Sequence, residues 1–207
     1  MSAPTINYGK LRNRGVEIQV GHMNQVRDFS YGISFMASFN KNKVLDLLAP
    51  SYGTYINEVG LPYGEYYMWE WIGLFQSEEE VASAPKHPYK IQPGDLKLKD
   101  QNDDGVIDGD DRIVVSGKYP KMVYSFNMDM AYKNVDLTLF FQGIEGRKIF
   151  THSYIVEPFA QGAPPCVEFR NAWTPENRDT NVPALYGGIP YYKAGSNPST
   201  YFLRDAS

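Results

Sequence analysis

The chain has 207 residues, a net charge of −4 and a pI of about 5.4, so its charge gives no support to a nucleic-acid-binding face. Aromatic residues make up 14 % of the chain, and Gly and Pro are plentiful, which favours β-structure over helices. The single cysteine, Cys166, excludes an internal disulfide, and no histidine pair stands at zinc spacing. No apolar run approaches the roughly 20 residues of a membrane helix. A transmembrane β-barrel would show no such run, because its apolar residues alternate with polar ones.

Two predicted strands open the chain and form an antiparallel hairpin. Residues 14–22 alternate apolar with small or polar side chains, a period of two that is typical of a strand. Residues 29–40 alternate in the same way, with Ser, Gly and Asn on one face. The apolar face of this second strand consists of Phe29, Tyr31, Ile33, Phe35, Ala37 and Phe39.

Residues 41–118 form a long, irregular segment that contains a cluster of aromatic residues. Ser77 followed by Glu80 has the capping-box pattern, which predicts the start of a short helix that Pro85 ends. Aromatic faces stack on sugar rings, so the aromatic residues before this helix are candidate ligand contacts. A local core under a long loop is the commoner reason for such a cluster. The candidate ligand-binding residues are Tyr66, Tyr67, Trp69 and Trp71.

The most specific single motif is the acidic loop of residues 100–111, which reads D-x-N-x-D-G-x-I-D-x-x-D. This is the spacing of an EF-hand-type calcium loop, because Ca²⁺ takes about six to eight oxygen ligands from alternate positions. Asp111 stands where a bidentate Glu is usual, which suggests weaker binding or a Mg²⁺-tolerant site. An Asp- and Gly-rich turn without an ion is the alternative. The predicted metal ligands are Asp100, Asn102, Asp104, Val106 through its carbonyl group, Asp108 and Asp111.

A second predicted hairpin consists of strands at residues 119–133 and 135–143, with a tight turn at Asn134. Both strands alternate apolar and polar side chains. Residues 144–200 are again irregular, with one predicted helix near residues 149–159. The last residues, 201–207, have the pattern of another strand opening.

The order of these elements favours a transmembrane β-barrel. Short and long connections alternate along the chain, as the turns and loops of outer-membrane barrels do. The apolar faces carry aromatic residues at their ends, as expected where a strand crosses both membrane interfaces. A soluble β-sandwich explains the alternation equally well but explains the long loops poorly. The predicted fold is therefore all-β, an antiparallel transmembrane β-barrel segment of about four long strands, with long extracellular loops (41–118 and 144–200) containing short helices.

Several motifs, in order along the chain, resemble those of SusC/RagA-type TonB-dependent outer-membrane proteins. Residues 94–112 resemble that family's G-D-x-K/R-x-x-D-x-N-x-D-G-x-I-x-x-x-D-R stretch. Each piece is weak alone, but the ordered set is specific and spans nearly the whole chain. The other matches are residues 13–17 (N-R-G-x-E), 120–127 (P-K-x-x-Y-x-F-N), 136–143 (D-L-x-x-x-F-Q-G), 173–177 and 201–207.

The resemblance implies a barrel of about 22 strands with a plug, placed in the lipid of a Gram-negative outer membrane. It implies import of glycan or peptide fragments, energy supplied through TonB, and a SusD-like surface lipoprotein as a cap. Residues 1–207 contain no recognisable plug and no TonB-contacting segment. We therefore expect this chain to be part of the C-terminal half of the barrel domain, which would reach TonB only through a missing N-terminal part.

The alternative function is a soluble, calcium-stabilised, β-rich carbohydrate-binding module. An enzyme is not expected, because the chain has no G-x-S-x-G, H-E-x-x-H or P-loop motif. Its three histidines, His22, His87 and His152, are scattered along the sequence. Dependence of folding on detergent would favour the barrel, whereas a soluble chain stabilised by Ca²⁺ would favour the module.

Overall fold

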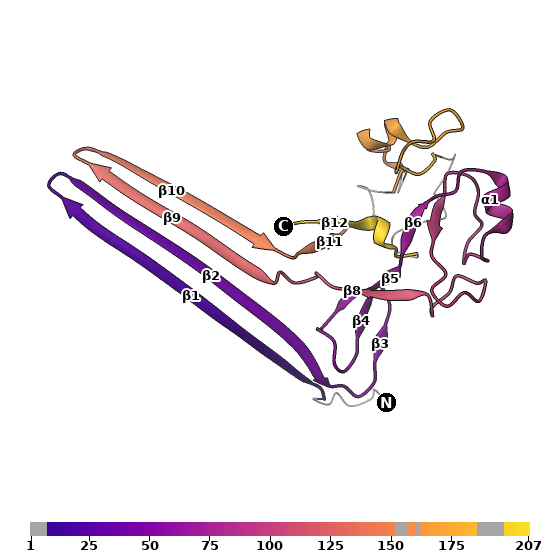
Figure 1. Cartoon of the computed structure of the whole chain (residues 1–207), viewed down its shortest axis with the longest axis horizontal. Coiled ribbons are helices and arrows are strands. Elements are labelled where there is room, and N and C mark those ends of the chain that lie inside the picture. Colours follow the sequence, from indigo (N-terminus) through magenta and orange to yellow (C-terminus); the bar gives the residue numbers. More distant parts are fainter. Residues whose placement is uncertain (1–7, 152–156, 160–161, 186–196) are drawn as a thin grey trace.

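The computed structural model describes residues 8–151, 157–159, 162–185 and 197–207. Its longest feature is a sheet of four antiparallel strands in the order β1-β2-β9-β10 (Figure 1). The predicted antiparallel β-fold is confirmed, and within this chain the barrel is not closed. The four strands are β1 (Lys10–Val26), β2 (Phe29–Asp46), β9 (Met122–Tyr132) and β10 (Val135–Glu145).

The strand register places the apolar side chains of all four strands on one side of the sheet. Phe35 of β2 lies opposite Val20 of β1 and Phe126 of β9, and Phe126 lies opposite Phe141 of β10. Val20, Phe35 and Phe141 remain 63 %, 43 % and 60 % exposed, so no described part of the chain covers this face. The other side carries mainly Ser, Gly, Asn, Gln and Asp residues. The sheet thus has one wide apolar face and one polar face.

Aromatic residues mark both ends of the apolar face. Phe29 and Tyr132 are cross-strand partners at one end, and Phe39 and Tyr124 lie near the other end. Phe29 and Phe39 are about ten residues apart, roughly 33 Å along a strand. At the usual barrel tilt this spans about 25 Å, the height of the apolar band of an outer-membrane barrel. The ring of Tyr124 packs over Gly143 of β10, where any Cβ atom would collide with it.

Two tight turns join the long strands at the end of the sheet that lies far from the loops. Each has two residues, 27–28 and 133–134, and the first residue of each has a positive φ of 55°. The Lys133 N–H donates to the Asp28 carbonyl oxygen at 3.3 Å, which links the two turns. The other end of the sheet continues into long connections.

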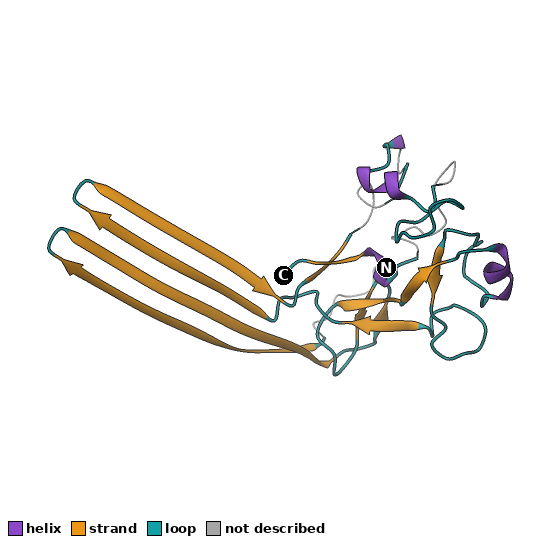
Figure 2. Cartoon of the chain, turned by 45° about the horizontal axis from the view of Figure 1, so that its top comes forward, coloured by secondary structure: helices purple, strands orange, loops and turns teal. Residues whose placement is uncertain are grey.

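The loops form a folded cap of small sheets at that other end (Figure 2). One sheet has the order β3-β4-β5-β8, and two further pairs are β6-β7 and β11-β12. No helix among the described residues is long and apolar enough to cross a membrane. The elements are β3 (Ser51–Tyr52), β4 (Tyr55–Asn57), β5 (Glu65–Trp69), β6 (Trp71–Leu74), α1 (Glu78–Ser83), β7 (Leu96–Leu98), β8 (Arg112–Val115), β11 (Lys148–Phe150), η3 (Val167–Asn171), η4 (Thr200–Phe202) and β12 (Leu203–Asp205).

The buried core lies mostly in this cap and not in the long sheet. Phe202, on η4, is fully buried and packs in one cluster with Leu74, Leu96 and Trp173. A second cluster joins Trp69, Leu98 and Ile107. The cap therefore brings together segments from both long connections. Few side chains of the long sheet are buried, because its apolar face is exposed.

Several local predictions can be compared with these elements. Ser77 is the N-cap of α1, as predicted, and its side chain accepts a hydrogen bond from the Glu80 N–H at 3.3 Å. The predicted helix near residues 149–159 is wrong at its start, because residues 148–150 form β11, which pairs with β12. Residues 152–156 of that prediction lie outside the described residues. The strand expected at residues 201–207 is β12, and it joins β11 rather than the long sheet.

Candidate functional site

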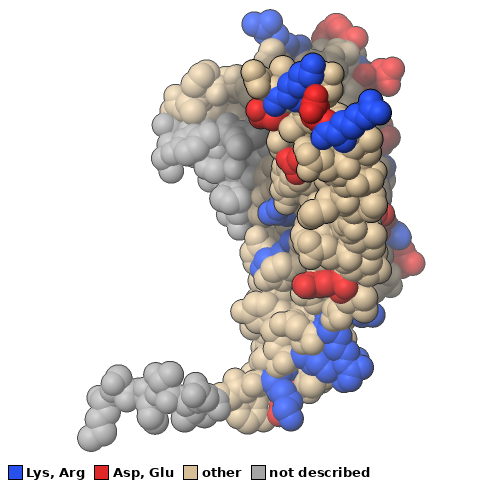
Figure 3. Space-filling model, turned by 90° about the vertical axis from the view of Figure 1, so that its left-hand side faces the viewer, with Lys and Arg blue, Asp and Glu red and all other residues tan. Residues whose placement is uncertain are grey.

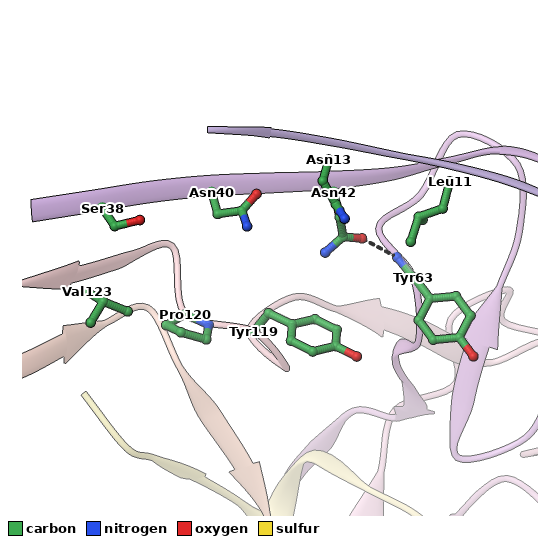
Figure 4. Close-up of a pocket in the computed structure, with 9 residues that line it drawn as sticks. All are labelled: Leu11, Asn13, Ser38, Asn40, Asn42, Tyr63, Tyr119, Pro120 and Val123. Carbon is green, nitrogen blue, oxygen red and sulfur yellow. Dashed lines mark hydrogen bonds between the residues drawn. The ribbon is translucent and has the colours of Figure 1, made fainter. Parts of the chain in front are cut away.

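A cavity of about 420 Å³ lies where the polar side of β1 and β2 meets the cap (Figure 4). Its volume is within the roughly 300–1,000 Å³ of small-molecule sites. Figure 4 shows side chains of β2 on one side of the cavity and two tyrosines from the long connection on the other. The polar side chains that line it are Asn13, Ser38, Asn40, Asn42, Tyr63 and Tyr119.

The strand geometry explains why these side chains come together. Ser38, Asn40 and Asn42 are alternate residues of β2 and therefore share its polar face. Asn13 of β1 lies directly opposite Asn42. Tyr63 is held at the rim because its backbone N–H donates to Asn42 Oδ1 at 2.6 Å. Strands β1 and β2 thus form one wall of the cavity, and the bond between Tyr63 and Asn42 attaches the cap at its rim.

The cavity is uncharged, and its polar side chains stand beside Leu11, Pro120 and Val123. None of its lining residues is ionisable at neutral pH, and the nearest acid in the register is Glu17, opposite Ser38. Among the described residues, the side chains of Asn13, Ser38 and Asn40 have no hydrogen-bond partner. Amide and hydroxyl groups both donate and accept hydrogen bonds. The site is therefore suited to a neutral ligand that does the same, flanked by tyrosine rings.

The predicted aromatic ligand surface is largely a local core. Tyr66 and Trp69 are each only 4 % exposed. The Tyr66 hydroxyl donates to the Lys148 carbonyl oxygen at 2.9 Å, and the Arg112 guanidinium covers the Trp69 ring at 4.4 Å. These two rings have no free face for a ligand in this structure. Burial therefore argues against ligand contact by Tyr66 and Trp69.

Tyr67 and Trp71, the other two aromatic candidates, are half-buried and are also tied to the fold. The Trp71 indole N–H donates to the Gly73 carbonyl oxygen at 2.6 Å, and its ring packs edge-on against Tyr201. The Tyr67 hydroxyl donates to the Gly109 carbonyl oxygen at 3.2 Å. For these two residues ligand contact stays a prediction.

Strand β5 also holds the acidic loop in place. The Trp69 indole N–H donates to the Asp108 carbonyl oxygen at 2.5 Å, next to the bond from Tyr67 to Gly109. Ile107 is 1 % exposed and packs against Trp69. Its N–H donates to the Lys86 carbonyl oxygen at 2.8 Å. The aromatic stretch therefore serves as the platform of the loop, a link that sequence spacing alone does not reveal.

Inside the loop, every predicted side-chain metal ligand accepts a hydrogen bond from a backbone N–H of the loop. Asp100 accepts from Asp103 and Gly105, and Asp111, which is fully buried, accepts from Gln101 and Asp108. The three remaining side chains accept one such bond each: Asn102 from Asp104, Asp104 from Val106 and Asp108 from Asp110. These bonds fix the direction of each oxygen.

The structure leaves metal binding by this loop as a prediction. No group of three or more His, Cys, Asp or Glu side chains in the described part of the chain lies close enough to hold a metal ion. The carboxylates are instead satisfied by backbone N–H groups. Asn102 and the Val106 carbonyl group are oxygen donors of the kind that Ca²⁺ accepts, but they do not by themselves make a site.

Two buried ionisable groups lie in the cap between α1 and β7. Burial raises the pKa of Asp95 to about 7, although one of its oxygens accepts a hydrogen bond from the Gln92 N–H. Burial lowers the pKa of His87 to about 4. The His87 ring lies edge-on between Phe75 and Tyr89, and neither of its nitrogens has a hydrogen-bond partner among the described residues. Neither residue lines the cavity. The ionisation of each therefore affects the stability of the cap.

The long sheet defines the class of protein. Four long antiparallel strands with one apolar and one polar face, tight turns at one end and long structured loops at the other form a segment of an outer-membrane-type β-barrel. No second sheet of the described residues covers the apolar face, as a soluble sandwich would require. The soluble module is therefore not favoured.

Comparison with known proteins finds similar outer-membrane receptors. The chain is 28 % identical over 215 residues to TonB-dependent receptor P26 of Formosa agariphila, covering 97 % of this chain and 21 % of that receptor. It is 29 % identical over 197 residues to TonB-dependent receptor P3 of the same organism, covering 88 % of this chain and 20 % of that receptor. No protein-family model matches the chain. The chain is therefore similar to about a fifth of two TonB-dependent receptors.

Solved structures show the same fold. The chain superimposes on a structure of the RagAB peptide transporter with a TM-score of 0.68 and 21 % identity, over 97 % of this chain and 22 % of that chain. For the RagAB peptide importer in its closed-closed state the TM-score is 0.65 and the identity 22 %, with the same coverage. The chain thus spans about a fifth of the length of its relatives.

Proposed function

We propose that this chain is part of the barrel wall and extracellular cap of an outer-membrane nutrient importer. The observation that carries the proposal is the apolar face, which is continuous across all four long strands and about as tall as a membrane's hydrocarbon layer. The relatives are named as TonB-dependent receptors, and the structural neighbours as a peptide transporter or importer. None is named as an enzyme.

In this proposal the two faces of the sheet have different roles. The apolar face contacts outer-membrane lipid, and the polar face lines the lumen through which the cargo passes. The cargo is a glycan or peptide fragment, its uptake is driven through TonB, and a SusD-like lipoprotein caps the barrel from outside. The cavity of Asn13, Ser38 and Asn40 is then a contact point for cargo at the extracellular mouth.

The test compares cells that carry the intact receptor with cells that lack it. Both are grown on a mixed digest of polysaccharides and proteins, and mass spectrometry measures which fragments disappear from the medium. The proposal predicts that one chemical class of fragment stays in the medium when the receptor is absent. A receptor without its TonB-contacting segment should behave like the deletion. Equal depletion by all strains would contradict import.

Variants of the cavity connect this test to the structure. Asn13→Ala combined with Asn40→Ala removes two unpaired amides and should slow uptake of the same class of fragment about 30-fold, since each hydrogen bond contributes about 1 kcal/mol. The control is Asn127→Ala on β9, which lies on the same polar face opposite Ser34, away from the cavity, and whose amide donates to Asp129 Oδ2 at 2.6 Å. Unchanged uptake in the double variant would remove the cavity from the proposal and leave import itself standing.

The acidic loop is proposed as a Ca²⁺ site that stiffens the cap. The support is the spacing of its oxygens and the backbone N–H bonds that orient all five side-chain ligands. Chelation, or Asp100→Ala combined with Asp104→Ala, should raise the protease sensitivity of residues 100–111 in the intact receptor. A loop whose cleavage rate is the same with EDTA, with Ca²⁺ and with Mg²⁺ holds no ion.

A further inference from the structure

Four basic residues gather on the outer face of the β1-β2 hairpin, directly above its apolar band. Arg14 of β1 lies opposite Lys41 of β2, and Arg12 lies opposite Lys43. All four side chains are exposed. By strand alternation they share the face that carries Val16, Ile18 and Val20 lower down. Figure 3 shows Lys and Arg side chains gathered at this end of the molecule, in the lower part of the view.

None of these four charges forms an ion pair among the described residues. The only ion pairs there join Lys97 to Glu80 and Lys99 to Glu70, both in the cap. Directly opposed like charges destabilise a strand pair, yet two such pairs follow each other on this hairpin. The nearest acid in the register is Asp46, which lies opposite Lys10, and Glu145 of β10 is two strands away from Phe39. An anion from outside the chain would neutralise the group.

The position of these four basic residues indicates which kind of anion binds them. A shallow cavity of about 310 Å³ is lined by Arg14, Val16, Phe39, Lys41 and Lys121. It thus combines cations with the aromatic and aliphatic residues that end the apolar band. The long loops lie at this end of the sheet, which is the extracellular side of an outer-membrane barrel. The cations therefore stand at the headgroup level of the outer leaflet.

We propose that Arg12, Arg14, Lys41 and Lys43 bind the phosphate groups of an outer-leaflet glycolipid whose acyl chains lie along the apolar face below. Arg offers planar, bidentate hydrogen bonding to phosphate, and Lys adds a point charge. The lipid bound here fixes the height of the barrel in the membrane and neutralises the opposed cations. The inference rests on the proposed outer-membrane location but not on import.

The experiment uses the intact receptor, purified in detergent, and native mass spectrometry to count retained lipid. The probes are phosphorylated lipid A, the same lipid after phosphatase treatment, and inorganic phosphate alone. Arg14→Gln combined with Lys41→Gln should bind phosphorylated lipid A about 30-fold more weakly, because each basic residue near an anionic surface contributes roughly a factor of five. The matched control, Arg27→Gln with Lys133→Gln, removes the same charge at the tight-turn end.

Each result decides the proposal. Loss of lipid A in the Arg14/Lys41 variant, retention in the Arg27/Lys133 variant and weak binding of the dephosphorylated lipid support it. Equal retention by both variants, equal binding of the dephosphorylated lipid, or binding of inorganic phosphate without lipid would overturn it. Uptake by the Arg14/Lys41 variant is measured in parallel, and a receptor that imports normally while losing the lipid separates this inference from the proposed function.

Discussion

Replacing one residue on each face of β2 tests which side of the sheet meets lipid. Phe35 and Ser34 are neighbours in sequence, lie near the middle of the apolar band and point to opposite faces. Phe35→Lys places a charge among Val20, Phe126 and the membrane. Ser34→Lys places the same charge on the polar face opposite Asn127. The two variants thus have the same added side chain at the same depth.

The expected difference follows from the depth of Phe35. A Lys on the lipid face at the membrane midplane destabilises an outer-membrane barrel by about 2–4 kcal/mol. At about 1.4 kcal/mol per tenfold change, this lowers the folding equilibrium constant roughly 30- to 900-fold. On the polar face the ammonium group stays in water, so Ser34→Lys should change stability by less than about 0.5 kcal/mol, as surface substitutions usually do.

The assay is the heat-dependent electrophoretic mobility of the intact receptor in outer-membrane fractions. Folded barrels migrate differently from unfolded chains, so the temperature at which the folded band disappears reports stability. The Phe35→Lys receptor should lose its folded band at a clearly lower temperature and reach the membrane in smaller amounts, whereas Ser34→Lys should match the unsubstituted receptor. Equal behaviour of the two variants, or greater damage from Ser34→Lys, would refute the assignment of the two faces.

Three further predictions concern the cap, and hydrogen exchange of cap amides in the intact receptor measures each of them. The pKa of Asp95 is raised to about 7, so its proton stabilises the folded cap and that stability is lost as pH rises from about 4 to about 7; Asp95→Asn should stabilise the cap above pH 7 by up to about 4 kcal/mol. The pKa of His87 is lowered to about 4, so protonation favours the unfolded cap as pH falls from about 6.5 to about 4, and His87→Phe should weaken this acid sensitivity. Asp111→Ala leaves two backbone N–H groups unpaired in a buried site and should lower cap stability by roughly 3 kcal/mol, whereas Asp110→Ala, on the exposed side of the loop, should lower it by less than about 0.5 kcal/mol. Faster exchange of cap amides in the Asp110→Ala receptor than in the Asp111→Ala receptor would contradict this assignment. Exchange whose pH dependence is unchanged by Asp95→Asn or by His87→Phe would contradict the other two.

The two faces of the long sheet could be predicted because they depend only on neighbouring residues. A period of two assigns each side chain to a face whatever strand lies next to it. Phe35 and Phe126, more than 90 residues apart in sequence, were each assigned to an apolar face by their own surroundings. The register then aligned those faces. The first hairpin is longer than predicted, because Arg12, Lys41 and Lys43 replace apolar residues while the strand pairing continues.

The cavity and the cap could not be predicted, because contacts distant in sequence build them. Tyr63 reaches the cavity through its bond to Asn42, and Tyr119 joins it from the far end of the same long connection. Residues 148–150 have no local strand signal, and they become β11 only because β12, more than 50 residues later, pairs with them. The aromatic residues stand out in the sequence, but their role as a local core depends on contacts with distant residues such as Arg112. Sequence periodicity does not predict such contacts.

The contacts of β5 connect the acidic loop to the cavity. At one end of this strand, Tyr67 and Trp69 bond to the Gly109 and Asp108 carbonyl groups of the loop. At its other end, the strand begins two residues after Tyr63, and the intervening Gly64 N–H donates to Asn57 Oδ1 at 2.8 Å. No residue of the loop lines the cavity, so we expect an ion in the loop to affect the cavity only through β5. It would stiffen the strand that positions Tyr63, so removing the loop's carboxylates should widen the range of cargo that is accepted before it abolishes uptake.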